Sequence, residues 1–200
     1  MILPRIDGGW EVLLCDAPWR FKSNSVEKPG RNAMRHYDTM TLAEIEALPV
    51  RDVVARDALL AFWITGPLLV VGAHLPIFKA WGFKPSAMGF VWIKTNRRHV
   101  ADAFTESDLF MGGGFTTRKN AEFIVFGKRG RSLRRNASVR EVIVSAVREH
   151  SRKPDEIHDR LETYAGERRR LEMFGRRSRP GWHVVGNEAT KFDPVPEAAE

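Results

Sequence analysis

Short apolar runs alternate with segments of helical spacing along most of this chain. The runs are rich in Val, Ile, Leu, Phe and Trp, and they predict buried strands. They lie at residues 11–15, 58–64, 86–94, 121–128, 141–147, 169–175 and 181–187. Strands that alternate with helices in this way predict an α/β fold, with a mainly parallel sheet and helices on both of its faces.

The segments between the runs carry helix signals, and they lie at residues 41–49, 67–81 and 151–165. Thr41, with Glu44 three residues later, predicts a capping box. Pro67 marks a helix start, and Pro76 predicts an internal kink or break because proline lacks the backbone N–H. Pro154, followed by acidic residues, predicts the start of the last helix.

The domain organisation follows from the same pattern. Residues 1–191 read as a single domain, and the proline-containing tail 192–200 reads as flexible. In open parallel sheets, ligands bind outside the carboxyl ends of the strands, where the strand order reverses. Asp16 directly follows the first predicted strand, so we expect it at such a site.

Composition excludes several classes of protein for this chain. The chain has 200 residues, 43% hydrophobic and 28% charged, and no apolar run has the length of about 18 residues that a membrane span needs. The N-terminus has no signal-peptide pattern, so a cytoplasmic protein without membrane contact is expected. Cys15 is the single cysteine, which excludes an intramolecular disulfide and a cysteine-based zinc site. The histidines show no spacing of metal ligands, so we expect no metal, and most of them are expected at the surface.

The net charge of +7 is concentrated in three clusters, at residues 96–98, 128–140 and 167–179. Clustered arginine and lysine residues attract a polyanion, and nucleic acid is the candidate this favours. The alternative is an ordinary solvated surface.

The sequence Asp16-Ala17-Pro18-Trp19 places an acid, a rigid turn and a large aromatic after the first strand. One interpretation is structural: a turn whose tryptophan packs on the sheet edge. The other is chemical. A carboxylate and a neighbouring backbone carbonyl can accept both hydrogens of an aromatic amine and so aim its nitrogen lone pair at an electrophile. Pro18 stiffens the turn and offers no competing N–H, while Trp19 can stack on a base.

This motif resembles the Asp-Pro-Pro-Trp motif of the adenine methyltransferase family typified by the catalytic subunit of the messenger-RNA N6-adenosine methyltransferase. Further segments are similar to that family in the same order: HYDTM (36–40), FWITGP (62–67), FVWIKTN (90–96), SRKPDEI (151–157), RRLEMFGR (169–176) and GWHVVGNE (181–188). The resemblance implies a Rossmann-like fold that uses S-adenosylmethionine, with the catalytic motif before the cofactor-binding segments. The implied activity is methylation of the 6-amino group of adenine. Ala17 departs from the motif and makes the turn less stiff.

The resemblance also implies the residues that hold the cofactor. Lys153 would meet the methionine carboxylate, Glu172 the ribose hydroxyls with Arg176 beside it, and Asn187 with Glu188 would close over the adenosine end. Asp16 would touch both the methionine ammonium group and the target amine. Taken alone, Glu172 could equally be a strand acid paired with a neighbouring arginine, and Asn187 a turn residue.

Residues 95–120 lack an apolar period and predict a loop that closes over the target base. Its basic residues, and two in the following cluster, are candidates for phosphate contacts: Arg97, Arg98, Arg118, Lys119, Arg134 and Arg135. Tyr37 could stack on the base or contact the cofactor, or be an edge aromatic.

DNA is favoured over RNA as the acceptor, because the short chain looks like a bacterial or phage member of the family. A duplex substrate would require the base to flip out of the stack. The alternatives are an RNA adenine methyltransferase and a catalytically silent, nucleic-acid-binding partner subunit of the same fold. A homodimer or a partner subunit is possible.

Overall fold

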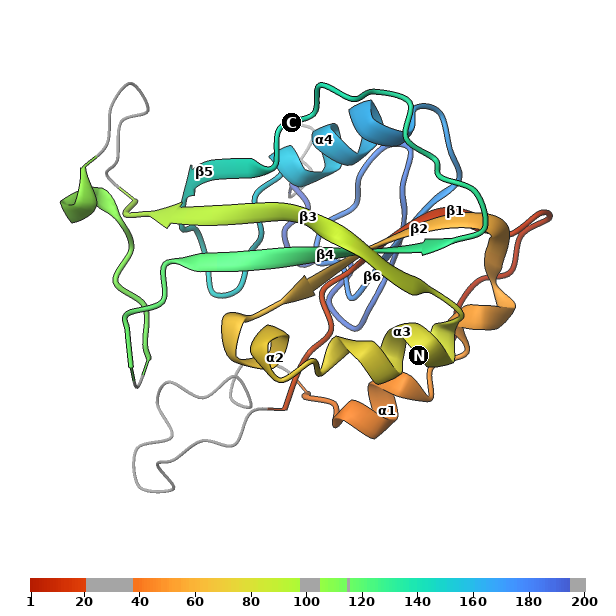
Figure 1. Ribbon diagram of the computed structural model, residues 1–200, viewed down its shortest axis with the longest axis horizontal. Helices are drawn as coiled ribbons and strands as arrows, with labels where there is room; N and C mark the ends of the chain where they lie inside the picture. The colour runs from red at the N-terminus through yellow and green to blue at the C-terminus, as the bar shows by residue number, and fades with distance from the viewer. Residues whose placement is uncertain (21–37, 98–104, 115, 195–200) are drawn as a thin grey trace, which may run out of the picture.

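The computed structural model describes residues 1–20, 38–97, 105–114 and 116–194. A seven-stranded sheet with the order β5-β3-β4-β2-β1-β6-β7 forms its centre (Figure 1). The strands are β1 (Trp10–Cys15), β2 (Val54–Ile64), β3 (Lys84–Thr95), β4 (Ala121–Arg129), β5 (Val142–Ala146), β6 (Arg170–Met173) and β7 (His183–Val185). Neighbouring strands pair in parallel, except that β4 runs antiparallel to both β2 and β3. The predicted mainly parallel α/β fold is confirmed.

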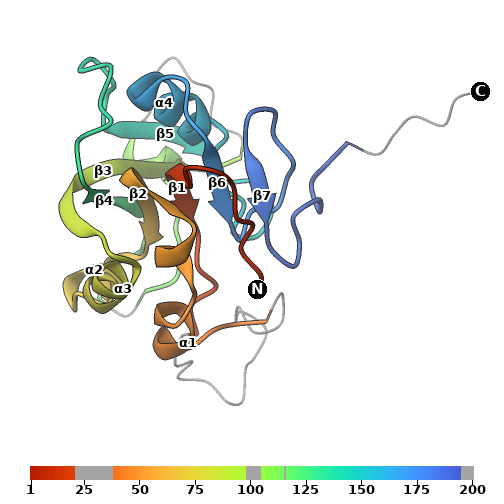
Figure 2. The same cartoon turned by 90° about the vertical axis from the view of Figure 1, so that its right-hand side faces the viewer.

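Helices cover both faces of the sheet, as predicted. They are α1 (Leu42–Glu46), α2 (Gly66–Val70), α3 (His74–Trp81) and α4 (Glu156–Ala165), with 3₁₀ turns at Val50–Asp52 and Glu106–Asp108. Figure 2 shows α1, α2 and α3 on one face and α4 on the other. The capping box of α1 is confirmed, since the Glu44 N–H donates to Thr41 Oγ1 at 3.2 Å and the Thr41 N–H to Glu44 Oε2 at 2.7 Å.

The break in the predicted helix 67–81 lies before Pro76, which corrects the expectation. Residues 71–73 separate α2 from α3, and Gly72 there has φ +68°, a conformation that glycine adopts without strain. Pro76 lies in the first turn of α3, where a backbone N–H has no partner within the helix to lose. The last helix begins at Glu156 rather than at Pro154.

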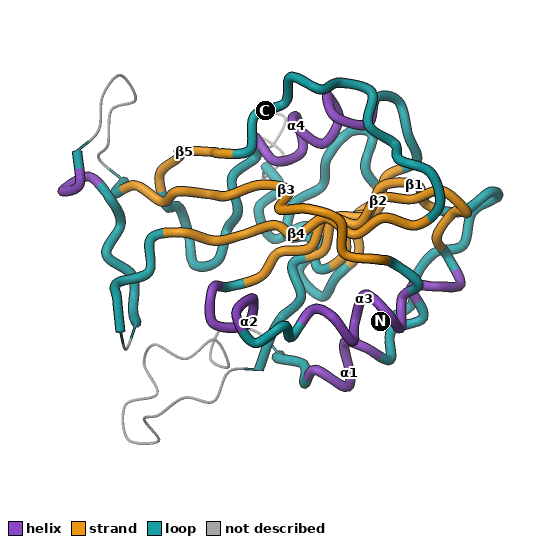
Figure 3. The backbone as a smooth tube through the Cα atoms, in the orientation of Figure 1, coloured by secondary structure: helices purple, strands orange, loops and turns teal. Residues whose placement is uncertain are grey.

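Two buried clusters, one on each face, make the core. On β1, Leu13 and Cys15 face the α1–α3 side, whereas Val12 and Leu14 face α4. Strands covered on both faces are apolar at consecutive positions, and this is the pattern that predicted them. The backbone tube in Figure 3 shows the strands passing between these helical layers. No helix among the described residues is long and apolar enough to cross a membrane.

The predicted C-terminal tail is partly described. Its first residues contact the domain, since the Phe192 N–H donates to the Arg176 carbonyl at 2.9 Å and Asp193 Oδ1 accepts from the Ser178 N–H at 2.6 Å. Residues 195–200 lie outside the described part of the chain.

Candidate active site

A hollow opens at the carboxyl ends of β1 and β6. The strand order reverses here, because the chain leaves β1 toward β2 and returns later to β6 on the other side of β1. The backbone N–H of Asp16 donates to the Met173 carbonyl at 3.4 Å, which fixes the start of the turn. The hollow is lined by Leu14, Asp16, Trp63, Ser151, Arg152, Lys153, Asp155, Ile157, His158, Glu172, Phe174, Gly175, Arg176, Arg177 and Phe192.

Asp16 takes part in a chain of ion pairs that crosses this edge of the sheet. Lys153 Nζ donates to Asp16 Oδ2 at 2.6 Å and lies 3.4 Å from Glu122 Oε2. Lys94 pairs with the other Glu122 oxygen. The side chain of Asp16 is 29% exposed, against 11% for Lys153 and 17% for Glu122, so Asp16 is the most accessible of these three ion-paired residues.

The pKa values of Asp16 and Glu122 are shifted in opposite directions. Burial raises the pKa of Asp16, and the nearby Glu122 adds to the effect, which Lys153 only partly opposes. Burial also works against the charge of Glu122, but Lys153 and Lys94 together outweigh it and hold the pKa of Glu122 below its usual range. Their surroundings therefore favour the protonated form of Asp16 and the ionised form of Glu122.

Glu122 and Lys94 are site residues that were not predicted from the sequence. Glu122 stands in an otherwise apolar predicted strand, and such an interrupted pattern is the signal that could have drawn attention to it. Its location follows from the direction of β4. Because β4 runs antiparallel to its neighbours, its first residues lie at the edge where the parallel strands end.

Glu172 pairs with a histidine rather than with an arginine. His158 Nε2 lies 2.9 Å from Glu172 Oε2, and both side chains are largely buried. The expectation that most histidines are at the surface is therefore wrong for His158 and also for His74, although His150 and His183 are exposed. The other two histidines lie outside the described residues. No group of three or more His, Cys, Asp or Glu side chains suited to a metal ion occurs in the described part of the chain.

Arg176 links the end of β6 to the C-terminal segment. Its Nε lies 2.8 Å from Glu188 Oε2, and its Nη1 donates to the His150 carbonyl at 2.6 Å. The ring of Phe192 contacts the guanidinium groups of Arg176 and Arg152, at 4.6 and 4.7 Å from the ring centre. Asn187 is exposed and does not line the hollow.

The groups around the hollow suit S-adenosylmethionine. Two acids, Asp16 and Glu172, can accept from an ammonium group and from ribose hydroxyls, and Lys153 and Arg176 can meet a carboxylate. Gly175 allows this arrangement, because a Cβ there would lie 2.3 Å from Val184 Cγ1 and 3.0 Å from Glu172 Cδ.

The turn after Asp16 is held by β-type pairing with the segment before α1. The Met40 N–H donates to the Pro18 carbonyl at 2.8 Å, and the Ala17 carbonyl accepts from the Trp19 N–H at 2.9 Å. The Trp19 ring is 7% exposed and packs edge-on against Phe62. This is the packing role that the sequence left open, and stacking of Trp19 on a base stays a prediction.

The predicted phosphate contacts do not share one surface. Arg97, Arg118 and Lys119 belong to the edge that carries Asp16, where Arg97 Nη2 donates to the Arg148 carbonyl at 2.8 Å. Tyr37 and Arg98 lie outside the described residues.

Arg134 and Arg135 lie away from the hollow, and contacts between them and phosphates stay a prediction. They belong to the segment that leaves the end of β4, passes over α4 and reaches the start of β5 (Figure 1). The Arg135 N–H donates to the Tyr164 carbonyl at 2.7 Å, in the last turn of α4. This is the opposite edge of the sheet from Asp16.

Comparison with known proteins finds similarity along most of the chain. The profile of the MT-A70 family matches residues 10–188. A probable N(6)-adenosine-methyltransferase MT-A70-like protein of Oryza sativa subsp. japonica is 30% identical over 185 residues, which cover 90% of this chain and 23% of the relative. The N(6)-adenosine-methyltransferase catalytic subunit METTL3 of Homo sapiens is 28% identical over 184 residues, which cover 90% of this chain and 28% of the relative.

A further relative is more similar in length. The type II methyltransferase M.MunI of Mycoplasma sp is 24% identical over 196 residues, which cover 90% of this chain and 77% of the relative. By contrast, the chain spans about a quarter of the length of the adenosine methyltransferases that it matches. The range matched by the family profile includes the lining of the hollow from Leu14 to Arg177, and Phe192 lies beyond it.

Proposed function

The chain belongs to the MT-A70 family, and from this membership we propose that it transfers a methyl group from S-adenosylmethionine to the 6-amino nitrogen of adenine in DNA. The observation that carries the proposal is the meeting of Asp16, Lys153 and Glu172 at one hollow. Asp16 follows β1, Lys153 precedes α4 and Glu172 lies in β6, and each has a chemical role in holding the donor or the acceptor.

The cofactor side of the hollow holds the donor. Bound S-adenosylmethionine supplies an electrophilic methyl group. Lys153 and Arg176 offer positive charge to its carboxylate, and Glu172 accepts hydrogen bonds from its ribose hydroxyls. We place Asn187 and Glu188 over the adenosine end on the family resemblance, and the pairing of Glu188 with Arg176 keeps this loop beside the hollow.

The acceptor side holds the amine. The ionised Asp16 carboxylate accepts one hydrogen of the 6-amino group, and the Ala17 carbonyl, which has a second lone pair beyond its bond to Trp19, accepts the other. Pro18 has no N–H to compete for these acceptors. The nitrogen lone pair is thereby aimed at the methyl group, so the main contribution of the chain is proximity and orientation.

The choice of DNA over RNA as the acceptor rests on the relatives of the chain. DNA is supported by M.MunI, of which this chain covers 77%, because type II methyltransferases as a class modify DNA. RNA is the second candidate, favoured by the higher identity to the adenosine methyltransferases, 30% for the rice protein against 24% for M.MunI. Arg97, Arg98, Arg118 and Lys119, with Tyr37, are the proposed contacts to the polymer near the target base.

Methyl transfer from labelled S-adenosylmethionine tests the proposal. Single-stranded DNA, double-stranded DNA and RNA of matched sequence are offered in parallel, and the product is digested to nucleosides and identified by mass. N6-methyladenine from DNA is the expected product. Methylation of RNA alone would overturn the choice of DNA, and no methylation by a preparation that binds S-adenosylmethionine would overturn the assigned reaction for this chain by itself.

A further inference from the structure

The Glu172 carboxylate is held in the hollow by one side chain, His158. The distance from His158 Nε2 to Glu172 Oε2 is 2.9 Å, and the side chains are 11% and 16% exposed. Among the described residues no other hydrogen bond to the Glu172 side chain is found. His158 comes from α4 and Glu172 from β6, so this contact joins a helix to the sheet beneath it.

The His158 ring is itself fixed by packing. The ring of Trp182 meets it edge-on, with centres 5.0 Å apart and planes at 87°. Trp182 Nε1 donates to Glu162 Oε1 at 2.7 Å, and Glu162 lies one helical turn after His158 on α4. A ring held in this way has one orientation in which Nε2 faces Glu172.

The partner of Nε2 indicates which ring nitrogen carries a hydrogen. His158 Nδ1 is buried without a hydrogen-bond partner, whereas Nε2 faces a carboxylate, which accepts and does not donate when ionised. A hydrogen on Nε2 satisfies this geometry, because the hydrogen bond then runs from His158 Nε2–H to Glu172. One oxygen of Glu172 is occupied, and the other is left for a ligand.

We propose that His158 is a positioning residue for the donor site: it orients the Glu172 carboxylate toward the ribose hydroxyls of S-adenosylmethionine. The inference rests on the proposed function, because that function supplies the ribose. An unsupported glutamate has several rotamers, and a ligand would have to select one of them on binding. The contact with His158 removes this cost in advance and so raises affinity without touching the ligand.

Two substitutions separate the hydrogen bond from the packing. His158→Phe keeps a ring against Trp182 and removes the donor, whereas His158→Gln loses the ring but places an amide N–H near the position of Nε2. His74→Phe is the matched control. His74 is also buried, its Nδ1 also lacks a partner, and it packs edge-on against Phe78 away from the hollow.

Calorimetric titration with S-adenosylhomocysteine, the product form of the donor, is the readout, and it needs no nucleic acid. We expect His158→Phe to weaken binding by about tenfold, the size of a modest hydrogen bond. His158→Gln should recover most of the affinity, and His74→Phe should bind as the wild type does. With saturating donor, kcat of His158→Phe should stay near that of the wild type while KM for the donor rises.

A double-variant cycle completes the test. If His158 acts through Glu172, His158→Phe should weaken binding little further once Glu172→Gln is present. Wild-type affinity in His158→Phe, or equal losses in His158→Phe and His158→Gln, would overturn the positioning role and leave the proposed function standing. A wild-type protein that binds no S-adenosylhomocysteine would overturn the proposed function and this inference together.

Discussion

Asp16 has a carboxylate that is costly to keep ionised in the folded protein, and the proposed chemistry needs it ionised. Burial raises its pKa above the ordinary 3.8 even though Lys153 lies at 2.6 Å. Stability from such a group is fully present below its unfolded pKa and is lost as the pH rises through its folded pKa. At neutral pH, therefore, the charge of Asp16 serves function at the expense of stability.

Replacing Asp16 with Asn tests the effect of this charge on activity and on stability. Asn keeps the shape but cannot serve as a charged acceptor, so we expect methyl transfer to fall by about a hundredfold or more. The melting temperature at neutral pH should not fall, because a charge that the fold disfavours has been removed while Lys153 retains Glu122 as a partner. Initial rates and thermal unfolding of the two proteins measure both effects. A rate within a few-fold of the wild type would remove Asp16 from the mechanism.

Glu122 raises the pKa of Asp16, so its removal should be visible in the pH profile. For the wild type, the rate should fall as the pH drops through the folded pKa of Asp16, which lies above 3.8. In Glu122→Gln the same fall should occur at lower pH, because the repulsion between the two carboxylates is gone. Unfolding free energy should drop by about 3 kcal/mol, because the largely buried Lys94 loses its carboxylate partner and Lys153 keeps only Asp16. Rates at saturating donor across pH give the result, and an unmoved profile would contradict the coupling.

Residue roles differ in how far they could be predicted from sequence. Asp16 follows an apolar strand directly, and that placement is visible in the pattern. The burial of Trp19 against Phe62 and of His158 against Trp182 depends on elements far away in the chain, so no local pattern indicates either contact.

At the scale of elements, β1 and the second part of β2 were predictable because they are covered on both faces and are therefore apolar at consecutive positions. The direction of β4 was not, since antiparallel pairing with β2 and β3 is decided by tertiary contacts rather than by composition. The helix break was misplaced for a local reason. Proline fits the first turn of a helix as well as it breaks an interior, and Gly72, not Pro76, separates α2 from α3.

The junction between β6 and β7 leaves no room for a side chain at Gly175. A Cβ there would lie 2.3 Å from Val184 Cγ1 and 3.0 Å from Glu172 Cδ. Gly175→Ala should therefore push β7 and Glu172 aside, lowering the unfolding free energy by about 1–3 kcal/mol and weakening donor binding. Gly113→Ala is the control, because a Cβ at Gly113 has no atom within 4 Å. Denaturant unfolding and donor titration measure both, and equal behaviour of the two variants would refute the close approach.

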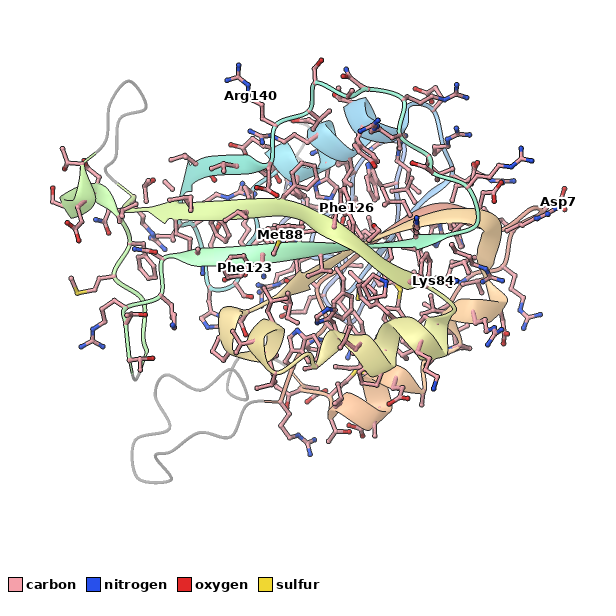
Figure 4. All side chains as sticks on the ribbon, in the orientation of Figure 1. Asp7, Lys84, Met88, Phe123, Phe126 and Arg140 are labelled. Carbon is pink, nitrogen blue, oxygen red and sulfur yellow. The ribbon has the colours of Figure 1, made fainter. Side chains whose placement is uncertain are left out.

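At the scale of the whole molecule, positive charge is arranged differently at the two edges of the sheet. Near the hollow, the cations Lys94, Arg148, Lys153 and Arg176 all have a carboxylate within 4 Å. At the end of β4 and in the segment that follows it, the exposed cations have no such partner among the described residues: Lys128, Arg131, Arg134, Arg135 and Arg140. Figure 4 labels Arg140, just before β5, and Lys84, at the start of β3. Lys84 pairs in register with Lys128 of β4. The basic clusters in the sequence could not show which cations are paired with carboxylates, because only the fold brings these side chains together.

The separation of the edges predicts a dependence on substrate length. The six residues of β1 span about 20 Å, and Arg134 and Arg135 lie at the opposite end of the sheet from Asp16, so a phosphate bound there is on the order of 20 Å from Asp16. A duplex of about 8 base pairs centred on the target reaches only about 14 Å to each side, whereas one of about 40 reaches well beyond about 20 Å. Replacing Arg134 and Arg135 together with Ala should weaken binding of the long duplex and flatten its salt dependence, while the short duplex is unaffected. Arg97→Ala, at the edge of Asp16, should weaken both. Wild-type affinity of the double variant for both duplexes would show that the segment after β4 is only a solvated surface. Weaker binding of both duplexes would contradict the model in which Arg134 and Arg135 contact DNA that extends beyond the target base.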